Sequence, residues 1–138
     1  MGKSFKDYEH EGWTKKASHY ERVALPITRQ GFEPILTSFG DLRGKRFLDV
    51  CTGPGHLAGE AATRGAAVDA VDFSEAMVRE AKARFSGISF TEGDAEALPY
   101  NDASFGTVRT SLIIQFQKPE VREQIMEELV KALVCRSL

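Results

Sequence analysis

Apolar residues recur at helical spacing in the first part of the chain. In the stretch "HEGWTKKASHYERVALP", Trp13, Ala17, Tyr20 and Ala24 fall on one helix face, and Pro26 ends that pattern. A proline ends a helix because it lacks a backbone N–H donor and its ring collides with the preceding turn. We therefore expect one helix that ends near Pro26.

A second helical pattern follows in "ITRQGFEPILTSFGDLRG". Its apolar positions are spaced i, i+3, i+4 and i+7, and they are Phe32, Ile35, Leu36 and Phe39. Gly40 and Gly44 mark its end, because glycine commonly closes a helix. Together the two patterns predict that residues 1–44 are mainly helical.

From residue 45 onward, short apolar runs alternate with amphipathic stretches. The runs expected to be strands are "RFLDVC", "AAVDAVD", "ISFTEGD" and "FGTVRTSLIIQF", and the turn "NDAS" precedes the last of them. The expected helices span residues 55–64, 74–85 with Ser74 as N-cap, and 119–134. Strands that alternate with helices predict a doubly wound, Rossmann-like α/β fold, in which a parallel sheet is covered on both faces.

The composition is that of one soluble globular domain. A chain of 138 residues with 42% hydrophobic residues is long enough for one core and too short for two, so we treat residues 1–138 as a single domain. A formal charge of −2 gives no electrostatic reason to expect nucleic acid or an anionic membrane as a partner. No apolar run is long enough to span a bilayer and no leader precedes the domain, which favours the cytoplasm. Cys51 and Cys135 lack metal-ligand spacing, so we expect reduced thiols and no metal site.

A tight glycine turn follows the first expected strand, in "FLDVCTGPGHLA". Gly53 and Gly55 let the backbone turn and approach a ligand, and the next helix begins with unpaired N–H groups. Asp72, at the end of the second expected strand, can accept hydrogen bonds from two neighbouring ribose hydroxyls. Both features belong at the carboxyl edge of the sheet, where doubly wound folds bind ligands. Two nucleoside cofactors fit, a nicotinamide dinucleotide, because "GPGHLA" matches G-x-G-x-x-A, and S-adenosylmethionine.

Four segments distinguish between these cofactors. "FLDVCTGPG", "VDAVDFSEAMV", "ISFTEGDAEALPYNDASFGTV" and "RTSLIIQF" resemble, in order and interval, the signature segments of class I S-adenosylmethionine-dependent methyltransferases, over roughly residues 45–120. The resemblance is to the small-molecule branch, methyltransferase type 11, that includes ubiquinone and menaquinone biosynthesis enzymes. It implies that S-adenosyl-L-methionine is the cofactor and that an O, N, S or carbon nucleophile of a small-molecule acceptor takes its methyl group by in-line displacement.

The resemblance also implies an organisation and a site. Residues 1–44 would form a helical cap over the site, residues 45–118 the cofactor-binding core with strand order 3-2-1-4, and residues 119–138 a C-terminal helix. The positions that match the family's contacts to the methionine part are Asp49, Cys51, Gly53, Gly55 and Ser111. Those that match its contacts to the ribose and the adenine are Asp72, Phe73, Met77, Asp94 and Ala95.

Each assignment has a purely structural alternative. Asp72 could terminate a strand, and Asp94 could start a turn. Phe73 and Met77 stand at the start of a helix, where apolar residues usually belong to the core. His56 has the titration range of an acid or base, but its position just inside the turn favours a helix-start residue.

The acceptor side of the site is less well defined by the sequence. His19 and Tyr20 lie in the helical cap, which in this family closes over the cofactor and contributes to substrate contact. Gln115 stands where many relatives have a histidine. No residue is identified as a catalytic base. A non-catalytic S-adenosylmethionine-binding or interaction module and an NAD-dependent oxidoreductase therefore stay open as alternative functions.

The sequence is shorter than the family pattern. Members of the family continue with three more strands, in the sheet order 3-2-1-4-5-7-6. We therefore expect the fourth strand at an open edge, where Arg109 could limit pairing or meet a partner's carboxylate. The last helix has an apolar face made of Val121, Ile125, Met126, Leu129, Val130 and Leu133. These features predict a homodimer through the fourth strand and the C-terminal helix, with a monomer as the alternative.

Overall fold

The computed structural model describes residues 2, 4–16, 19–111 and 117–133. Ahead of the first strand, the described residues form α1 (Phe5–Lys16), α2 (Tyr20–Val23), α3 (Leu25–Thr28), the 3₁₀ turn η2 (Arg29–Gly31) and α4 (Phe32–Ser38). The elements that follow are β1 (Arg46–Val50), α5 (His56–Thr63), β2 (Ala67–Asp72), α6 (Glu75–Arg84), β3 (Ser89–Glu92), β4 (Thr107–Thr110) and α7 (Pro119–Ala132).

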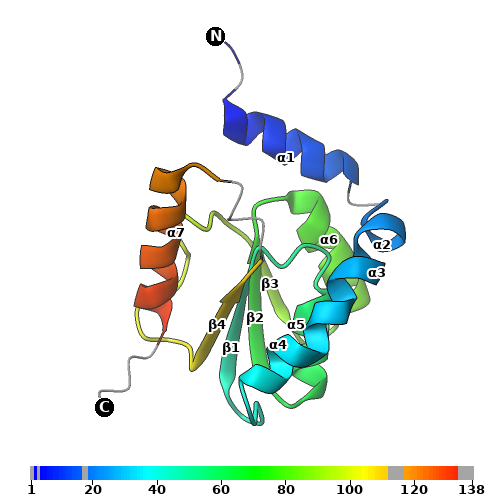
Figure 1. The fold of residues 1–138 in the computed structure, drawn as a ribbon, viewed down its shortest axis with the longest axis vertical. Helices are drawn as coiled ribbons and strands as arrows, with labels where there is room; N and C mark the ends of the chain where they lie inside the picture. The colour runs from blue at the N-terminus through cyan, green and yellow to red at the C-terminus, as the bar shows by residue number, and fades with distance from the viewer. Residues whose placement is uncertain (1, 3, 17–18, 112–116, 134–138) are drawn as a thin grey trace.

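The described strands form one parallel sheet in the order β3-β2-β1-β4. This order and the helices on both sides of the sheet confirm the doubly wound α/β fold that the sequence predicts (Figure 1). β1 lies inside the sheet, where Asp49 is opposite Ala70 of β2 on one side and opposite Arg109 of β4 on the other. Because all the strands are parallel, the segments that follow them leave the sheet at the same edge.

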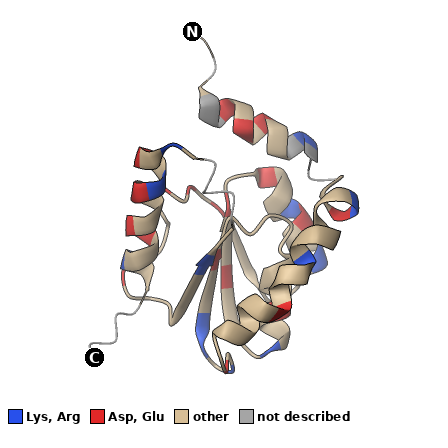
Figure 2. Ribbon diagram, viewed as in Figure 1, with Lys and Arg blue, Asp and Glu red and all other residues tan. Residues whose placement is uncertain are grey.

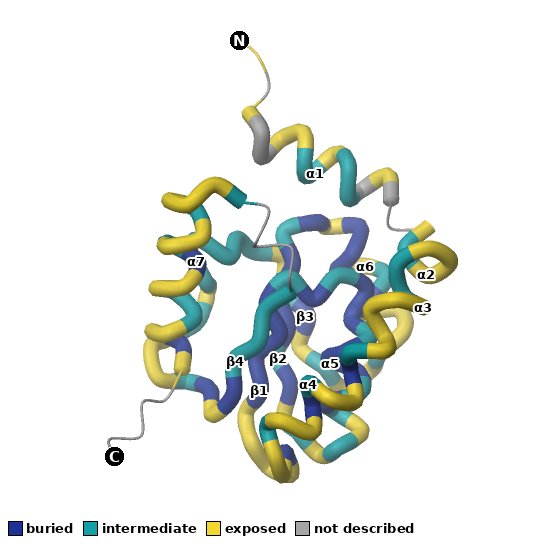
Figure 3. Tube along the Cα trace, in the orientation of Figure 1, coloured by how far each residue is buried: buried dark blue, intermediate teal, exposed yellow. Residues whose placement is uncertain are grey.

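Alternate residues of the strands enter two hydrophobic clusters, one on each face of the sheet. On one face Phe47 packs with the apolar sides of α4, α5 and α6. On the other face Leu48 and Val50 pack with Phe105 and with Ala132 of α7. Phe47 and Leu48 are fully buried, and removing each from water contributes about 1.5–3 kcal/mol. β1 and most of β2 are thus buried, with α4, α5 and α6 packed on one face and α7 on the other, whereas β4 is half-buried along most of its length (Figure 3).

Gly55 joins the turn after β1 to the first of these clusters. It is the N-cap of α5 and has a left-handed backbone, with φ of 83°. A Cβ at this position would lie 2.8 Å from the ring of Phe90 and 3.0 Å from the Cβ of Ala81. Glycine is therefore needed here because the turn sits directly on β3 and α6.

The N-terminal helices differ from the single helix that the sequence predicts. α1 ends at Lys16, and a separate helix, α2, begins at Tyr20. Pro26 lies in the first turn of α3, where a missing backbone N–H breaks no helical hydrogen bond. The expectation of a single helix that ends near Pro26 was wrong, because proline is also favourable in the first turn of a helix. Trp13 and Tyr20 still lie together, since both pack against the buried cluster of Ala76 and Met77 in α6.

α7 lies against β4, and a backbone bridge between Phe105 and Leu133 fixes its end. Ile125 faces the interior and is buried. Met126, Val130 and Leu133 point away from it and are 49%, 67% and 38% exposed. The apolar face of this helix is therefore covered only in part within the described structure.

Some sequence-based expectations concern undescribed parts of the chain. Residues 112–116 of the fourth predicted strand, with Gln115 among them, and Cys135 lie outside the described residues.

Acidic and basic residues are interspersed along α7 (Figure 2). Within the described ranges, no helix combines the length and the apolar character needed to cross a membrane.

Candidate functional site

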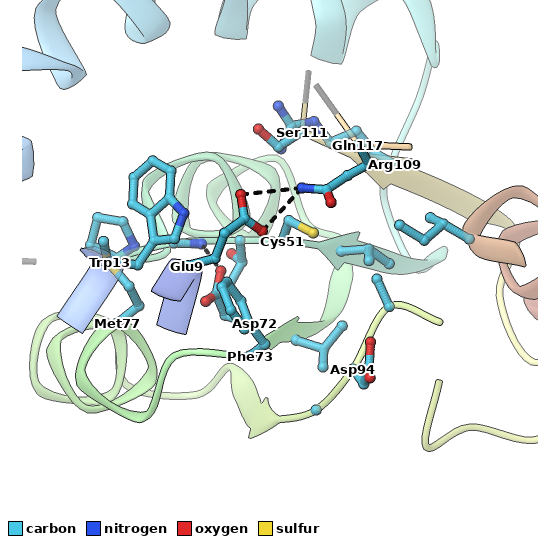
Figure 4. A pocket seen from close by; sticks show the side chains of 18 of the residues that line it. Glu9, Trp13, Cys51, Asp72, Phe73, Met77, Asp94, Arg109, Ser111 and Gln117 are labelled. Atoms are coloured by element: carbon cyan, nitrogen blue, oxygen red, sulfur yellow. Dashed lines mark hydrogen bonds between the residues drawn. The ribbon is translucent and has the colours of Figure 1, made fainter. Parts of the chain in front are cut away.

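A cavity of about 450 Å³ lies at the carboxyl edge of the sheet. Its wall is built from α1, the turn after β1, the ends of the other strands and the start of α7 (Figure 4). The sequence-predicted site residues that line it are Tyr20, Cys51, Gly53, Asp72, Phe73, Met77, Asp94, Ala95 and Ser111. Asp49, Gly55 and His19 do not line it, and Gln115 lies outside the described residues.

The Asp72 carboxylate at the end of β2 connects the glycine turn to the start of α6. Its Oδ2 accepts a hydrogen bond from the backbone N–H of Gly53 at 2.8 Å, and its Oδ1 accepts one from the N–H of Ser74 at 3.0 Å. Burial raises the pKa of Asp72, although the bonds from Ser74 and Gly53 oppose that shift. The carboxylate keeps lone pairs for further donors, such as two vicinal hydroxyls.

Ser74 fixes the first turn of α6 as the predicted N-cap. Its Oγ accepts a hydrogen bond from the backbone N–H of Met77 at 3.4 Å. Met77 is only 1% exposed and forms with Ala76 the buried cluster against which Trp13 packs, so it belongs to the core as well as to the cavity wall. Phe73 makes an edge-to-face contact with His10 of α1, with ring centroids 5.8 Å apart. The positions of Phe73 and Met77 are therefore compatible both with packing in the core and with contact to a ligand in the cavity.

Asp94 and Ala95 follow β3 and line the cavity beside Asp72. The Oδ1 of Asp94 accepts a hydrogen bond from the N–H of Glu96 at 3.0 Å, which holds the carboxylate in a local turn. Two carboxylates thus lie at the ends of the neighbouring strands β2 and β3. The described residues nevertheless include no group of three or more side chains placed to hold a metal ion.

Asp49 lies behind the cavity and is fully buried in β1. Its Oδ2 accepts a hydrogen bond from the Thr52 hydroxyl at 2.8 Å, and its Oδ1 accepts one from the Arg109 guanidinium at 2.9 Å. Arg109 lines the cavity and Asp49 does not, so Arg109 is the member of the pair that borders the space for a ligand. The charge of Arg109 in the middle of β4 therefore pairs with a carboxylate of its own chain, and not with one of a partner chain.

Cys51 begins the glycine turn with a left-handed backbone, φ 59°, which is uncommon for a residue with a Cβ. Burial, followed by the negative charge of Asp72, raises the pKa of its thiol to about 12. A thiol with this pKa is almost entirely protonated at neutral pH and is a poor nucleophile. Cys51 is therefore a wall of the cavity and unsuited to covalent catalysis.

Glu9 and Gln117 are cavity residues that the sequence did not single out. The Gln117 side-chain amide donates to both Glu9 carboxylate oxygens, at 3.3 and 3.1 Å (Figure 4). The two residues are 108 positions apart, so no local pattern could have paired them. Their contact holds α1 to the segment that precedes α7, across the cavity.

His56 takes part in a contact between helices. Its Nε2 accepts a hydrogen bond from Arg84 at 2.9 Å, because a guanidinium can only donate, and it lies 3.5 Å from Glu21. Arg84 also forms an ion pair with Glu21 of α2. Burial, and then the charge of Arg84, lowers the pKa of His56. These contacts tie α2 to α5 and α6, which favours the structural interpretation of His56.

The charge around the cavity distinguishes between the two candidate cofactors. The described residues that line it include four carboxylates and two cations, namely Glu9, Asp72, Asp94 and Glu96 against Arg109 and Lys118. An excess of negative charge attracts a cation and repels a pyrophosphate. A pyrophosphate would also need the N–H of Gly53 near the start of α5, and Asp72 already uses that donor. The arrangement favours a sulfonium cofactor over a dinucleotide.

Comparisons with known proteins agree with this geometry. A protein family described as a methyltransferase domain matches residues 47–135. A demethylmenaquinone methyltransferase of Beutenbergia cavernae is 37% identical over 99 residues, which cover 72% of this chain and 41% of that protein. A malonyl-[acyl-carrier protein] O-methyltransferase of Pseudescherichia vulneris is 32% identical over 102 residues, covering 74% of this chain and 40% of that protein.

A solved structure shows the same similarity. The crystal structure of an S-adenosylmethionine-dependent methyltransferase from Mesorhizobium loti matches with a TM-score of 0.63 and 26% identity, over 72% of this chain and 47% of that one. The present chain spans about two fifths of the length of the two curated relatives. The family match, the curated relatives and the fold lead to one conclusion: the chain belongs to the S-adenosylmethionine-dependent methyltransferases.

Proposed function

We propose that this chain binds S-adenosyl-L-methionine in the cavity and transfers its methyl group to a small-molecule acceptor by in-line displacement. The observation that carries the proposal is the buried carboxylate of Asp72. Backbone N–H groups of Gly53 and Ser74 hold it beside the cavity, where it can accept hydrogen bonds from the ribose diol. The acidic character of the cavity wall supports a cationic cofactor.

The described residues fit such a cofactor. A Cβ at Gly53 would meet no atom within 4 Å, so the turn leaves open space next to Asp72. On the side of β2 and β3, the cavity offers apolar side chains and a carboxylate for the adenine, from Phe73, Met77 and Asp94. On the side of β1 and β4, Cys51 and Ser111 border the space for the methionine part.

The chemistry requires little more than alignment from the protein. When bound, the sulfonium supplies an electrophilic methyl group that a nucleophile can displace. Asp72 would orient the ribose, and the contact between Glu9 and Gln117 would keep α1 across the cavity and limit the entry of water. Alignment of two reactants lowers a barrier by roughly 7 to 11 kcal/mol in well-oriented systems.

The acceptor is proposed only as a class. One curated relative is named for demethylmenaquinone and another for malonyl-[acyl-carrier protein], so the names within the family differ in acceptor. Val121 and Ile125 of α7 give the cavity an apolar wall on the side of that helix. This wall supports a small acceptor with an apolar part.

Calorimetric titration with S-adenosylmethionine, S-adenosylhomocysteine and NAD tests the proposal. Asp72→Ala should weaken binding of S-adenosylhomocysteine by about 1–3 kcal/mol, because hydrogen bonds to a buried carboxylate are lost. Asp69→Ala is the matched control, since Asp69 lies in the same strand, pairs with Arg46 at 3.3 Å and does not line the cavity. The affinity of Asp69→Ala for S-adenosylhomocysteine should equal that of the wild-type chain.

Each alternative gives a different result. Binding of NAD without binding of S-adenosylhomocysteine would reject the proposal in favour of an oxidoreductase. A folded Asp72→Ala variant with unchanged affinity would remove the ribose assignment. Binding of the cofactor without methyl transfer to any acceptor in a panel of small molecules would favour a non-catalytic binding module.

A further inference from the structure

Arg109 is a cation on the cavity wall, and the proposed function assigns it no role. It lies opposite Asp49 in the register of β1 and β4, and its NH1 nitrogen donates to Asp49 Oδ1 at 2.9 Å. The Asp49 side chain is 0% exposed, whereas 16% of the Arg109 side chain is exposed. Thr52 occupies the other oxygen of Asp49. The carboxylate is thus held inside the protein, and Arg109 is the member of the pair that borders the cavity.

The strand order indicates which end of the cofactor meets this guanidinium. Asp94 follows β3 and Asp72 ends β2, so the proposed adenosine contacts occupy one half of the cavity edge. A ligand laid along the edge continues past β1 toward β4, where Cys51, Arg109 and Ser111 line the cavity (Figure 4). In S-adenosylmethionine the group that continues from the adenosine is an amino acid, with an ammonium and a carboxylate.

We propose that Arg109 binds the α-carboxylate of the cofactor and that Asp49 is the positioning residue that aims the guanidinium. This inference rests on the proposed function and adds to it the residue that selects the amino-acid end. A guanidinium has five N–H donors in a planar fork, and its bond to Asp49 uses one nitrogen. The fork can therefore donate to carboxylates on two sides, one from the protein and one from the ligand.

Lys118 is the other cation among the described residues of the cavity wall. It is exposed at the N-cap of α7, where water screens an ion pair and reduces its strength. Arg109 is mostly buried, so its hydrogen bond to a ligand carboxylate is stronger. The cavity should therefore prefer ligands that carry the carboxylate, and this preference should depend on Arg109.

Two ligands and three variants test the assignment. S-adenosylhomocysteine is compared with S-adenosyl-3-thiopropylamine, which has the same adenosine, sulfur and amine but lacks the carboxylate. The wild-type chain should bind S-adenosylhomocysteine at least about tenfold more tightly, the scale of a charge-assisted hydrogen bond. In Asp49→Asn/Arg109→Gln the preference should disappear, while the affinity for the amine analogue stays within about twofold of the wild-type value.

The double substitution is chosen because Arg109→Gln alone would leave Asp49 as an unpaired buried charge. Arg109→Lys is the second variant; it keeps the charge and replaces the fork by a single ammonium, so the preference should fall in part. Lys118→Gln is the control and should keep the full preference. Circular dichroism and thermal unfolding establish that each variant is folded.

The outcomes separate this inference from the proposed function. Equal binding of both ligands by the wild-type chain overturns the role of Arg109, and so does an unchanged preference in either folded Arg109 variant. Loss of the preference in Lys118→Gln assigns the carboxylate to Lys118 and overturns it as well. A wild-type chain that binds neither ligand contradicts the proposed function itself, and the carboxylate assignment with it.

Discussion

Gly53 and Gly55 are left-handed residues of the same turn, with φ of 57° and 83°. A Cβ at Gly53 would meet nothing within 4 Å, and Gly53 lines the cavity. A Cβ at Gly55 would collide with Phe90, and Gly55 does not line the cavity. The first glycine therefore leaves room for a ligand, and the second leaves room for the core.

This difference predicts opposite phenotypes for two alanine substitutions. Each adds left-handed strain of about 1–2 kcal/mol. Gly55→Ala adds overlap with the core, which lowers the free energy of unfolding by about 1–3 kcal/mol more. Gly53→Ala should instead weaken binding of S-adenosylhomocysteine, because its Cβ enters the open space beside Asp72. Urea unfolding and calorimetry measure the two effects; equal stabilities would contradict the packing role of Gly55.

His56 predicts a pH dependence of stability. Burial and Arg84 lower its pKa in the folded chain below the ordinary value near 6.5, so the folded state binds this proton less readily than the unfolded state. The stabilisation is fully present above about pH 6.5 and is lost as the pH falls through the folded-state pKa. Glu21 and Arg29 also act on this ring, Glu21 raising and Arg29 lowering its pKa.

His56→Gln keeps a carbonyl that can accept from Arg84 and removes the titration. Unfolding free energies, measured in urea from about pH 8 to about pH 5, should fall less steeply for this variant than for the wild-type chain. Parallel pH profiles for the two chains would show that the histidine does not contribute.

Local sequence was enough to place some site residues and not others. Ser74, Met77 and Asp72 lie within a few positions of one another, so a strand end, a cap and a helix start determine their arrangement. The Asp49–Arg109 pair joins residues 60 positions apart and depends on the register of β1 and β4, which packing decides. From the sequence, Arg109 was expected at an open edge, where it could limit pairing or meet a partner's carboxylate, whereas the structure pairs it with Asp49 of its own chain. The roles of these residues toward the cofactor stay predictions.

At the scale of elements, α5 and α6 meet where α5 has a glycine. A Cβ at Gly59 would overlap the ring of Phe85, which follows α6. In an exposed helix, glycine to alanine stabilises by about 1 kcal/mol. Here the overlap reverses the sign of the change in stability. The Phe85 ring would have to move and lose its edge-to-face contact with His56, in which the ring centroids are 5.7 Å apart.

Gly59→Ala should therefore lower the free energy of unfolding by about 1–3 kcal/mol. In a Phe85→Ala background the same substitution should raise it by about 1 kcal/mol, since only helix propensity remains. Urea unfolding of the four chains completes the cycle. The same loss in both backgrounds would mean that the helices do not make this contact.

The elements from α4 onward follow the sequence closely, and those before α4 do not. The predicted helix over residues 55–64 is α5, His56–Thr63, because the glycine turn and the apolar spacing agree on its start. The N-terminal segment failed because its helices are only four residues long around Pro26. Packing holds such short helices, through Tyr20 on the Ala76 and Met77 cluster and through Leu25 on the larger core, so their ends leave little local signal.

At the scale of the whole molecule, α7 and its C-cap carry an exposed apolar surface, formed by Met126, Val130 and Leu133. It lies against β4, which is the edge strand of the described sheet. We propose that two copies associate through this helix and strand, because exposed apolar side chains beside an open edge favour association.

Light scattering on a size-exclusion peak should give about twice the monomer mass of 15.3 kDa. Met126→Glu/Val130→Glu should give the monomer, because each carboxylate would have to be desolvated at the interface. Val23→Glu, at a 69% exposed position of α2, is the control and should stay dimeric. A wild-type mass near 15.3 kDa at high protein concentration would reject the dimer.

The half-buried thiol of Cys51 gives the cavity a chemical reporter of ligand binding. Burial raises the pKa of this thiol to about 12, so it is almost entirely protonated at pH 8 and an alkylating reagent reacts with it slowly. Because Cys51 lines the cavity, a ligand bound there covers the sulfur and slows this reaction in proportion to its occupancy. The rate of thiol modification therefore follows the filling of the cavity without any label on the ligand.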